Sequence, residues 1–111
     1  MKPKFKVWVV FGDRVKLGDG RAQLLELINE LGSIKKAVAQ FGMSYRNAWG
    51  YLRELEKAAG FKILERTPGG GPVGGTRLTE AGRQFLNRYW RFSRGAEEAI
   101  KRQFARSFKK K

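Results

Sequence analysis

The segment from Ser33 to Gly60 constrains the fold more than any other part of the chain, because it carries two helical patterns joined by a short turn. After Ser33, an N-cap type residue, apolar residues recur at i, i+3, i+4 and i+7 and predict an amphipathic helix. Gly42-Met43-Ser44 ends this helix and caps the next, whose apolar residues also form one stripe before a C-cap at Gly60. A helix, a Gly-containing turn and a second helix predict a helix-turn-helix unit over residues 33–60.

The outer face of the second helix is basic and predicts contact with DNA. The sequence has no Asp or Glu between Glu30 and Glu54. Arg46 and Asn47 occupy the first helical turn, where an arginine pairs with guanine and an asparagine with adenine, although either could be an ordinary exposed residue. Gly50 weakens the helix by up to about 1 kcal/mol relative to Ala, so its exposed position indicates close approach to the DNA backbone.

A second group of residues is expected to hold phosphates, which position a protein on DNA without reading its sequence. Any one of these residues could be plain solvated charge or a surface hydroxyl, and the hypothesis depends on the set. The expected phosphate contacts are Ser33, Lys35, Lys36, Arg53, Arg66, Thr67 and Arg77.

Composition supports nucleic acid as the partner. The 111 residues, a length typical of one domain (1–111), contain 24 Lys and Arg against 10 Asp and Glu, for a net charge of +14. Because the chain has neither Cys nor His, the usual zinc ligands, thiol nucleophiles and histidine bases are excluded, so we expect no metal, no cofactor and no enzyme activity. The sequence shows no transmembrane run, signal peptide or lipidation motif, so we expect a cytoplasmic, nucleoid-associated protein with no membrane partner.

The N-terminal part predicts a β-hairpin over residues 1–18. Apolar residues alternate from Phe5 to Phe11, Gly12-Asp13 suits a turn, and a shorter strand returns over residues 14–17. A basic arm that grips DNA through its lysines is the alternative reading, which the regular alternation disfavours. Asp19 is expected to cap the next helix, at Arg21–Leu31, which completes a three-helix core over residues 19–60.

Residues 61–78 predict a second hairpin, with strands at 61–66 and 75–78. The loop between them is rich in Gly and Pro and has Arg66 and Arg77 at its edges. A hairpin that follows a helix-turn-helix is a wing. A nucleotide-phosphate loop is the weaker alternative, because the GK[ST] element is missing. The wing glycines are Gly69, Gly70, Gly71, Gly74 and Gly75.

Thr79 caps a long last helix over residues 79–108. Its aromatic surface exceeds what one small core should cover, so a homodimer is expected, and a helix folded back on its own domain is the alternative. Gly95 is the expected weak point of this helix. The residues expected at the dimer interface are Phe85, Tyr89, Phe92, Ala96 and Ile100.

Several segments together resemble the N-terminal DNA-binding domain of the ModE family of molybdate-responsive transcription regulators over about residues 5–105. They are Gly32-Ser33-Ile34, Gly42-Met43-Ser44-Tyr45, Ala48-Trp49, Leu64-Glu65-Arg66, the glycine-rich loop 69–75 and Leu78-Thr79-Glu80-Ala81-Gly82. The more distant LysR-type regulators share Leu-x-Glu-Arg and Leu-Thr-Glu-Ala-Gly, but they look different on the recognition helix and lack such a wing.

The resemblance implies a winged helix-turn-helix dimer on a palindromic operator, a mainly α fold with a small β-sheet (α+β). It also places Ser44, Tyr45 and Trp49 beside Arg46 on the recognition helix. From the helical pattern, Tyr45 is expected to pack with its hydroxyl free for a phosphate, and Trp49 is as well suited to half-burial as to a base or sugar contact. Molybdate sensing in this family belongs to C-terminal modules beyond the region of resemblance, so molybdate binding by this chain is not expected.

The sequence is compatible with three functions. The first is a sequence-specific transcription regulator, and the second is an architectural, chromatin-like protein that coats DNA without sequence preference. The third is an interaction module of a larger complex. The first predicts base-specific losses on mutation, the second only salt-dependent losses, and the third no DNA binding near physiological salt.

Overall fold

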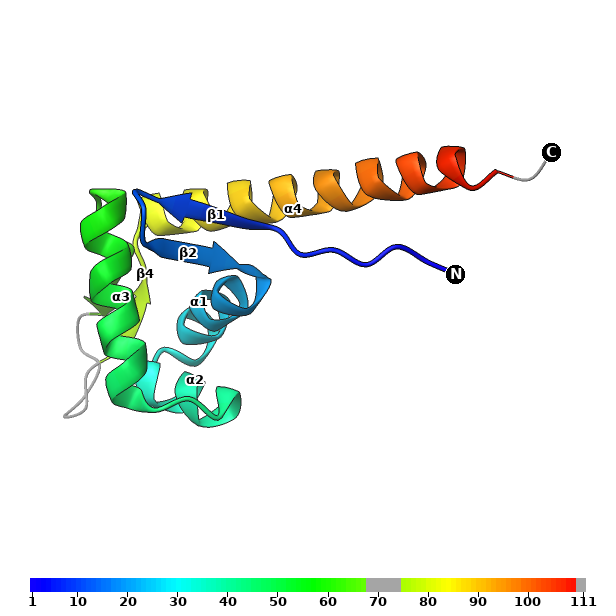
Figure 1. Cartoon of the computed structure of the whole chain (residues 1–111). Coiled ribbons are helices and arrows are strands. Elements are labelled where there is room, and N and C mark those ends of the chain that lie inside the picture. Colours follow the sequence, from blue (N-terminus) through cyan, green and yellow to red (C-terminus); the bar gives the residue numbers. More distant parts are fainter. Residues whose placement is uncertain (68–74, 110–111) are drawn as a thin grey trace.

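The computed structural model describes residues 1–67 and 75–109 and has the winged helix-turn-helix, α+β architecture expected from the sequence. It is mainly helical, with two separate two-stranded antiparallel sheets, β1–β2 and β3–β4. Figure 1 shows α4 extending well beyond the other elements. In chain order the elements are β1 (Trp8–Phe11), β2 (Val15–Gly18), α1 (Asp19–Leu31), α2 (Ile34–Phe41), α3 (Tyr45–Ala59), β3 (Leu64–Thr67), β4 (Gly75–Leu78) and α4 (Glu80–Ser107).

The helix-turn-helix forms where the sequence predicts it, because local capping fixes both ends of both helices. The Oγ of Ser33 accepts a hydrogen bond from the Lys36 amide at 3.1 Å, and the Oγ of Ser44 accepts one from the Asn47 amide at 3.0 Å. Gly42 ends α2 in the left-handed conformation, with φ of 65°, which a side chain would strain. These caps fix the angle at which α3 leaves the turn.

The core forms around α1, which packs against α2, β2, β4 and α4. Its residues Leu24, Leu25 and Ile28 are fully buried, together with Leu55 of α3 and Leu78 of β4. Burying each such side chain stabilises the fold by about 1.5 to 3 kcal/mol. The apolar face of α3 is therefore held in the core, and its opposite face is left to solvent.

The N-terminal hairpin is shorter than predicted. Its first strand begins at Trp8 rather than near Lys4, and Phe5 is 37% exposed. Phe11 pairs with Val15, so three residues form the turn instead of two. The alternation from Phe5 to Phe11 predicts too long a first strand, because β2 offers only four residues with which β1 can pair. The inward side chains Val9 and Phe11 pack against the core as expected.

Asp19 does not cap α1, contrary to expectation. Gly18 is the N-cap and forms no side-chain cap hydrogen bond. The Oδ1 of Asp19 instead accepts hydrogen bonds from the Tyr89 hydroxyl at 2.6 Å and from the Ser93 hydroxyl at 3.1 Å. These two α4 donors turn the carboxylate away from the amides of its own helix.

The first wing strand is displaced relative to the prediction, from residues 61–66 to Leu64–Thr67. Phe61 packs with its ring edge toward Phe85, 6.2 Å between ring centroids, instead of pairing with β4. Of the predicted wing glycines, Gly75 begins β4, whereas Gly69, Gly70, Gly71 and Gly74 lie outside the described residues.

The segment Leu78-Thr79-Glu80-Ala81-Gly82 joins the wing to α4. Thr79 caps the helix as predicted, because its Oγ1 accepts a hydrogen bond from the Gly82 amide at 2.9 Å. The Thr79 hydroxyl also donates to the Lys62 carbonyl at 2.6 Å. A Cβ at Gly82 would collide with the backbone carbonyl of Ile63, so only glycine lets α4 pass this closely. Helix α4 continues through Gly95 to Ser107 without a break.

Candidate nucleic-acid interface

Helix α3 presents the predicted base-reading residues to solvent. Ala48, Leu52 and Leu55 are buried on one face of the helix, whereas Arg46 and Asn47 on its first turn are exposed. Ser44 is also exposed, and its hydroxyl hydrogen remains available because the cap uses only the oxygen as an acceptor. The first turn of α3 therefore presents hydrogen-bond donors to solvent, while the opposite face of the helix is held in the core.

Gly50 lies on the same exposed face. A Cβ built at this position would meet nothing within 4 Å, and its backbone has no positive φ. Neither packing nor backbone conformation in the described part of the chain therefore explains a glycine here. A surface that must come close to another molecule does explain it.

Tyr45 and Trp49 form an aromatic pair on the edge of α3. Their rings are 6.3 Å apart, edge to face at 74°, and they are 46% and 41% exposed. The expectation that Tyr45 is packed is therefore wrong, since the body of its ring is open to solvent. Trp49 is exposed to a similar extent, so its ring is available for the base or sugar contact that was one of its two interpretations. Together they provide an apolar surface of the kind that contacts sugars and thymine methyl groups.

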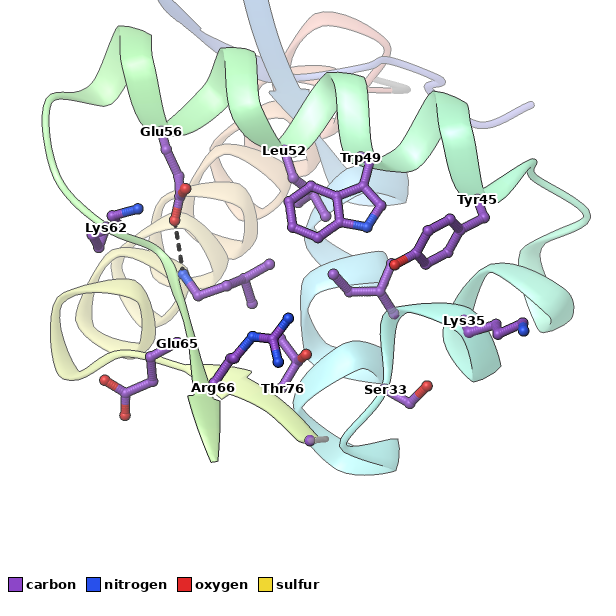
Figure 2. Close-up of a pocket in the computed structure, with 13 residues that line it drawn as sticks. Ser33, Lys35, Tyr45, Trp49, Leu52, Glu56, Lys62, Glu65, Arg66 and Thr76 are labelled. Atoms are coloured by element: carbon purple, nitrogen blue, oxygen red, sulfur yellow. Dashed lines mark hydrogen bonds between the residues drawn. The ribbon is translucent and has the colours of Figure 1, made fainter. Parts of the chain in front are cut away.

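A cleft of about 500 Å³ separates α3 from the wing strands. Figure 2 shows Trp49 and Tyr45 on the α3 side, Ser33 and Lys35 at the beginning of α2, and Arg66 reaching from β3 toward α3. Leu52 forms part of the floor. The cleft is open, has apolar walls and carries cations at its rim, so it suits a sugar-phosphate strand that runs between recognition helix and wing.

The predicted phosphate contacts are not equivalent in the structure. Lys35, Lys36, Arg53 and Arg66 are exposed. Arg77 instead donates to the carboxylate of Glu65 directly across the wing hairpin, at 2.7 Å, so its charge is already paired. Ser33 and Thr67 are only partly exposed, and the Ser33 oxygen caps α2.

Two polar side chains that sequence reasoning missed hold the wing strands against the helices, one from α3 and one from α1. The carboxylate of Glu56, on α3, accepts hydrogen bonds from the amides of Ile63 at 2.7 Å and Leu64 at 3.0 Å. Figure 2 shows one of these bonds. Asn29 of α1 accepts a hydrogen bond from the Leu78 amide at 2.9 Å. The sequence carries no signal for either role, because these three amides become neighbours of the two side chains only after folding.

Tyr51 was also missed, and it fixes α3 to the N-terminal hairpin. Its hydroxyl donates to the Lys16 carbonyl at 2.7 Å, and the Arg21 guanidinium lies over its ring at 4.9 Å. Burial raises the pKa of Tyr51 to about 12, and the positive charge of Arg21 opposes only part of that rise. The tyrosine therefore stays neutral and keeps donating its hydrogen bond throughout the physiological range.

The predicted dimer residues divide into two groups. Tyr89 is only 2% exposed within its own chain, and Phe85 packs against Phe11 at 5.4 Å between ring centroids. For Tyr89 the expectation needs correction, since it is covered by its own domain. Phe92 is 49% exposed, and Ala96 and Ile100 are partly exposed. The open apolar surface of α4 therefore begins at Phe92.

The described residues lack two other features. Across residues 1–67 and 75–109 no helix combines the length and apolar character that crossing a bilayer requires. In the same residues no three acidic, cysteine or histidine side chains gather in a way that could hold a metal ion.

A helix-turn-helix with a basic, solvent-facing second helix and an adjacent wing defines the class of winged helix-turn-helix DNA-binding regulators. Comparison with known proteins gives the family. The pattern of the bacterial regulatory helix-turn-helix proteins of the lysR family matches residues 21–83, and the chain belongs to that family. This family is one of regulatory proteins, and the ModE proteins of Haemophilus influenzae and Escherichia coli are transcriptional regulators.

The chain is similar to several ModE proteins, which confirms the resemblance seen in the sequence. It is 37% identical over 80 residues to the transcriptional regulator ModE of Haemophilus influenzae, covering 72% of this chain and 31% of that protein. It is 37% identical over 73 residues to the molybdenum transport protein ModE of Azotobacter vinelandii, covering 66% and 27%. It is 33% identical over 69 residues to the DNA-binding transcriptional dual regulator ModE of Escherichia coli, covering 62% and 26%. The chain thus spans about a third or less of these relatives' length.

Proposed function

We propose that the chain binds DNA sequence-specifically, as a homodimer on a two-fold symmetric operator, and so regulates transcription in the cytoplasm at the nucleoid. The observation that carries the proposal is the exposed first half of α3, where Arg46, Asn47 and Gly50 face solvent on a helix whose other side is fixed in the core. Base edges are read by such rigidly held side chains at the beginning of a recognition helix.

The base contacts are assigned to the residues that α3 and its cap expose. Arg46 and Asn47 read bases, Ser44 and Tyr45 flank them, and Gly50 permits close approach. Trp49 lines both the cleft and this surface, where it contacts a sugar or a methyl group.

The phosphates are held by Lys35, Lys36, Arg53 and Arg66. Arg77 contributes mainly by fixing the wing through Glu65.

The homodimer is supported by the course of α4. After Ser93 none of its residues is buried, although the helix continues for about 20 Å at 1.5 Å per residue. The molecule is consequently 66 Å long but only 28 and 23 Å across. An apolar strip that begins at Phe92 and continues through Ala96 and Ile100 is suited to the same strip on a second copy. Molybdate binding is not assigned to this chain.

Selection of bound sequences from a random duplex pool, at about 150 mM salt, tests the proposal. A two-fold symmetric motif with half-sites about 34 Å apart supports both the regulator and the dimer. A single asymmetric motif would contradict the dimer but not the regulator. Retarded DNA without enrichment would replace the proposal with an architectural DNA-coating protein, which the net charge of +14 favours.

A further inference from the structure

The side of α4 that faces away from the domain carries unpaired arginines. Between Glu80 and Glu97 this helix contains Arg83, Arg88, Arg91 and Arg94 but no acidic residue. Arg83 pairs with Glu80, and Arg94 donates to the carbonyl of Trp90. Arg88 and Arg91 are exposed and form no ion pair with any residue in 1–67 or 75–109.

Gly95 lies in the middle of this arginine face. Arg91 is four residues before it, Arg88 seven before and Arg102 seven after, so all lie on one side of the helix at about 100° per residue. Glu98, three residues after Gly95, is the acid nearest to this side. A glycine within a helix costs about 1 kcal/mol relative to Ala, yet a Cβ at Gly95 would meet nothing within 4 Å. The packing of the described chain therefore gives no reason for this glycine.

The same combination occurs on the recognition helix. There Gly50 has open space around it, an ordinary helical backbone, and exposed arginines at positions 46 and 53. A bare stretch of helix between arginines lets a backbone approach closely while the guanidinium groups reach phosphates on either side. Helix α4 repeats this arrangement on a surface that the operator-binding proposal does not use.

The two surfaces lie at opposite ends of the folded part of the chain. The first residues of α3 lie beside α2, and Figure 1 shows α2 and α4 at opposite ends of the folded part of the chain. Helix α4 packs against α1 and β4. A ligand on the arginine face would thus be a separate molecule or a distant part of the same one.

We propose that the arginine face of α4, made by Arg88, Arg91 and Gly95, is a second binding surface for double-stranded DNA. It allows one protein to hold two duplexes, or two distant segments of one. A two-fold contact between copies at Gly95 is disfavoured, because it would bring Arg88, Arg91 and Arg102 of both chains together with only one nearby acid in each chain, Glu98. The apolar strip from Phe92 remains free for dimerisation, since it follows a different side of α4.

A capture experiment tests the proposal. One duplex is immobilised, the protein is bound, and retention of a second, fluorescent duplex of unrelated sequence is measured over a series of salt concentrations. Wild-type protein retains the second duplex, and Arg88→Gln with Arg91→Gln reduces that retention at least about tenfold. Loss of two phosphate contacts lowers the slope of log affinity against log salt for the second duplex by about 1.8.

Three comparisons make the result specific to this face. Arg14→Gln with Lys101→Gln removes the same charge from the β1–β2 turn and from a lysine already paired with Glu97, and should retain the second duplex. Arg88→Lys with Arg91→Lys keeps both charges and should restore most of the retention. Affinity for the first duplex should not change in any of these variants.

Four outcomes would overturn the proposal. Two are unchanged retention in the double variant Arg88→Gln with Arg91→Gln, and an equal loss of retention in the double variant Arg14→Gln with Lys101→Gln. The other two are a change of oligomeric state in the Arg88→Gln with Arg91→Gln variant, and displacement of the second duplex by polyglutamate as efficiently as by DNA. Equal loss would mean that retention follows net charge alone. A changed oligomeric state would mean that the face joins copies of the chain. Any duplex can be immobilised, so the experiment remains informative even if no operator is found.

Discussion

The hydroxyl of Tyr89 donates a 2.6 Å hydrogen bond to Oδ1 of Asp19 and so fastens α4 to the first residue of α1. Tyr89→Phe removes the shorter of the two side-chain hydrogen bonds on that carboxylate and leaves the one from Ser93 at 3.1 Å. We expect the free energy of unfolding to fall by about 1.5 to 3 kcal/mol, measured by urea denaturation. Tyr45→Phe is the matched control, because Tyr45 is exposed and should change stability by less than about 0.5 kcal/mol. Equal effects of the two substitutions would contradict the role of Asp19.

Stability should fall at high pH because two tyrosines resist ionisation in the folded protein. Burial, and then the hydrogen bond and charge of Asp19, raise the pKa of Tyr89 far above 10.0, and burial raises the pKa of Tyr51 to about 12. A group with a raised pKa contributes stability that is complete below its unfolded value, near 10, and is lost as the pH rises through the folded value. We therefore expect the free energy of unfolding to be lower at about pH 11 than at about pH 8. Tyr51→Phe should reduce this difference, and an unchanged difference would contradict the contribution of Tyr51.

Gly50→Ala should stabilise the protein and weaken its binding to DNA. The substitution removes a helix-weakening glycine, and the new methyl group contacts nothing in the described chain, so stability should rise by up to about 1 kcal/mol. The same methyl group would obstruct close approach to DNA and lower operator affinity. Gly20→Ala is the control, because Gly20 is exposed in α1, a Cβ there also meets nothing within 4 Å, and operator affinity should not change. Unimpaired binding by Gly50→Ala would remove Gly50 from the interface.

Arg46 and Arg53 should differ in the kind of binding energy that they supply. Arg46→Ala is expected to cost about 1 to 3 kcal/mol and to relax sequence preference at one base pair. Arg53→Ala should weaken binding to all sequences and reduce the salt slope by about 0.9. Titrations of the selected operator and of variants with single base changes, over a series of salt concentrations, separate the two effects. Identical behaviour of both variants would assign Arg46 to the phosphates.

Gly82→Ala should destabilise the protein, because the added Cβ has no room beside the Ile63 carbonyl. Such overpacking costs about 1 to 3 kcal/mol, measured again by urea denaturation. Gly95→Ala, in the same helix but in open space, should change stability in the opposite direction. A loss of stability in both variants would mean that helix α4 tolerates no added side chain for some reason other than the contact at Ile63.

The sequence was sufficient for features that depend on local chemistry. The caps at Ser33, Ser44 and Thr79 involve amides three residues away, so their residue types and spacing alone predict where α2, α3 and α4 begin. The buried stripe of α3 and the exposed position of Arg46 follow from the helical period in the same way. The family resemblance rests on these same local segments.

Contacts between distant segments could not be predicted. Asp19 was expected to cap its own helix and Glu56 was given no role, but Glu56 binds the amides of Ile63 and Leu64 at the start of β3, and Asp19 binds hydroxyls of α4. Tyr89 had the spacing of an interface residue and lies in the core. In each case the partner is far away in the sequence or on another element, where neither periodicity nor residue type carries a signal.

The amide of Thr76 donates a 2.9 Å hydrogen bond to the carbonyl of Gly32, which links the base of the wing to the turn between α1 and α2. Glu56 adds a second link, from α3 to Ile63 and to Leu64 at the start of β3. The recognition helix and the wing strands are therefore held at a fixed separation. Because the protein sets this separation, the duplex must supply a matching groove width. Base pairs that no side chain contacts then affect affinity, since their sequence determines how easily the groove widens or narrows.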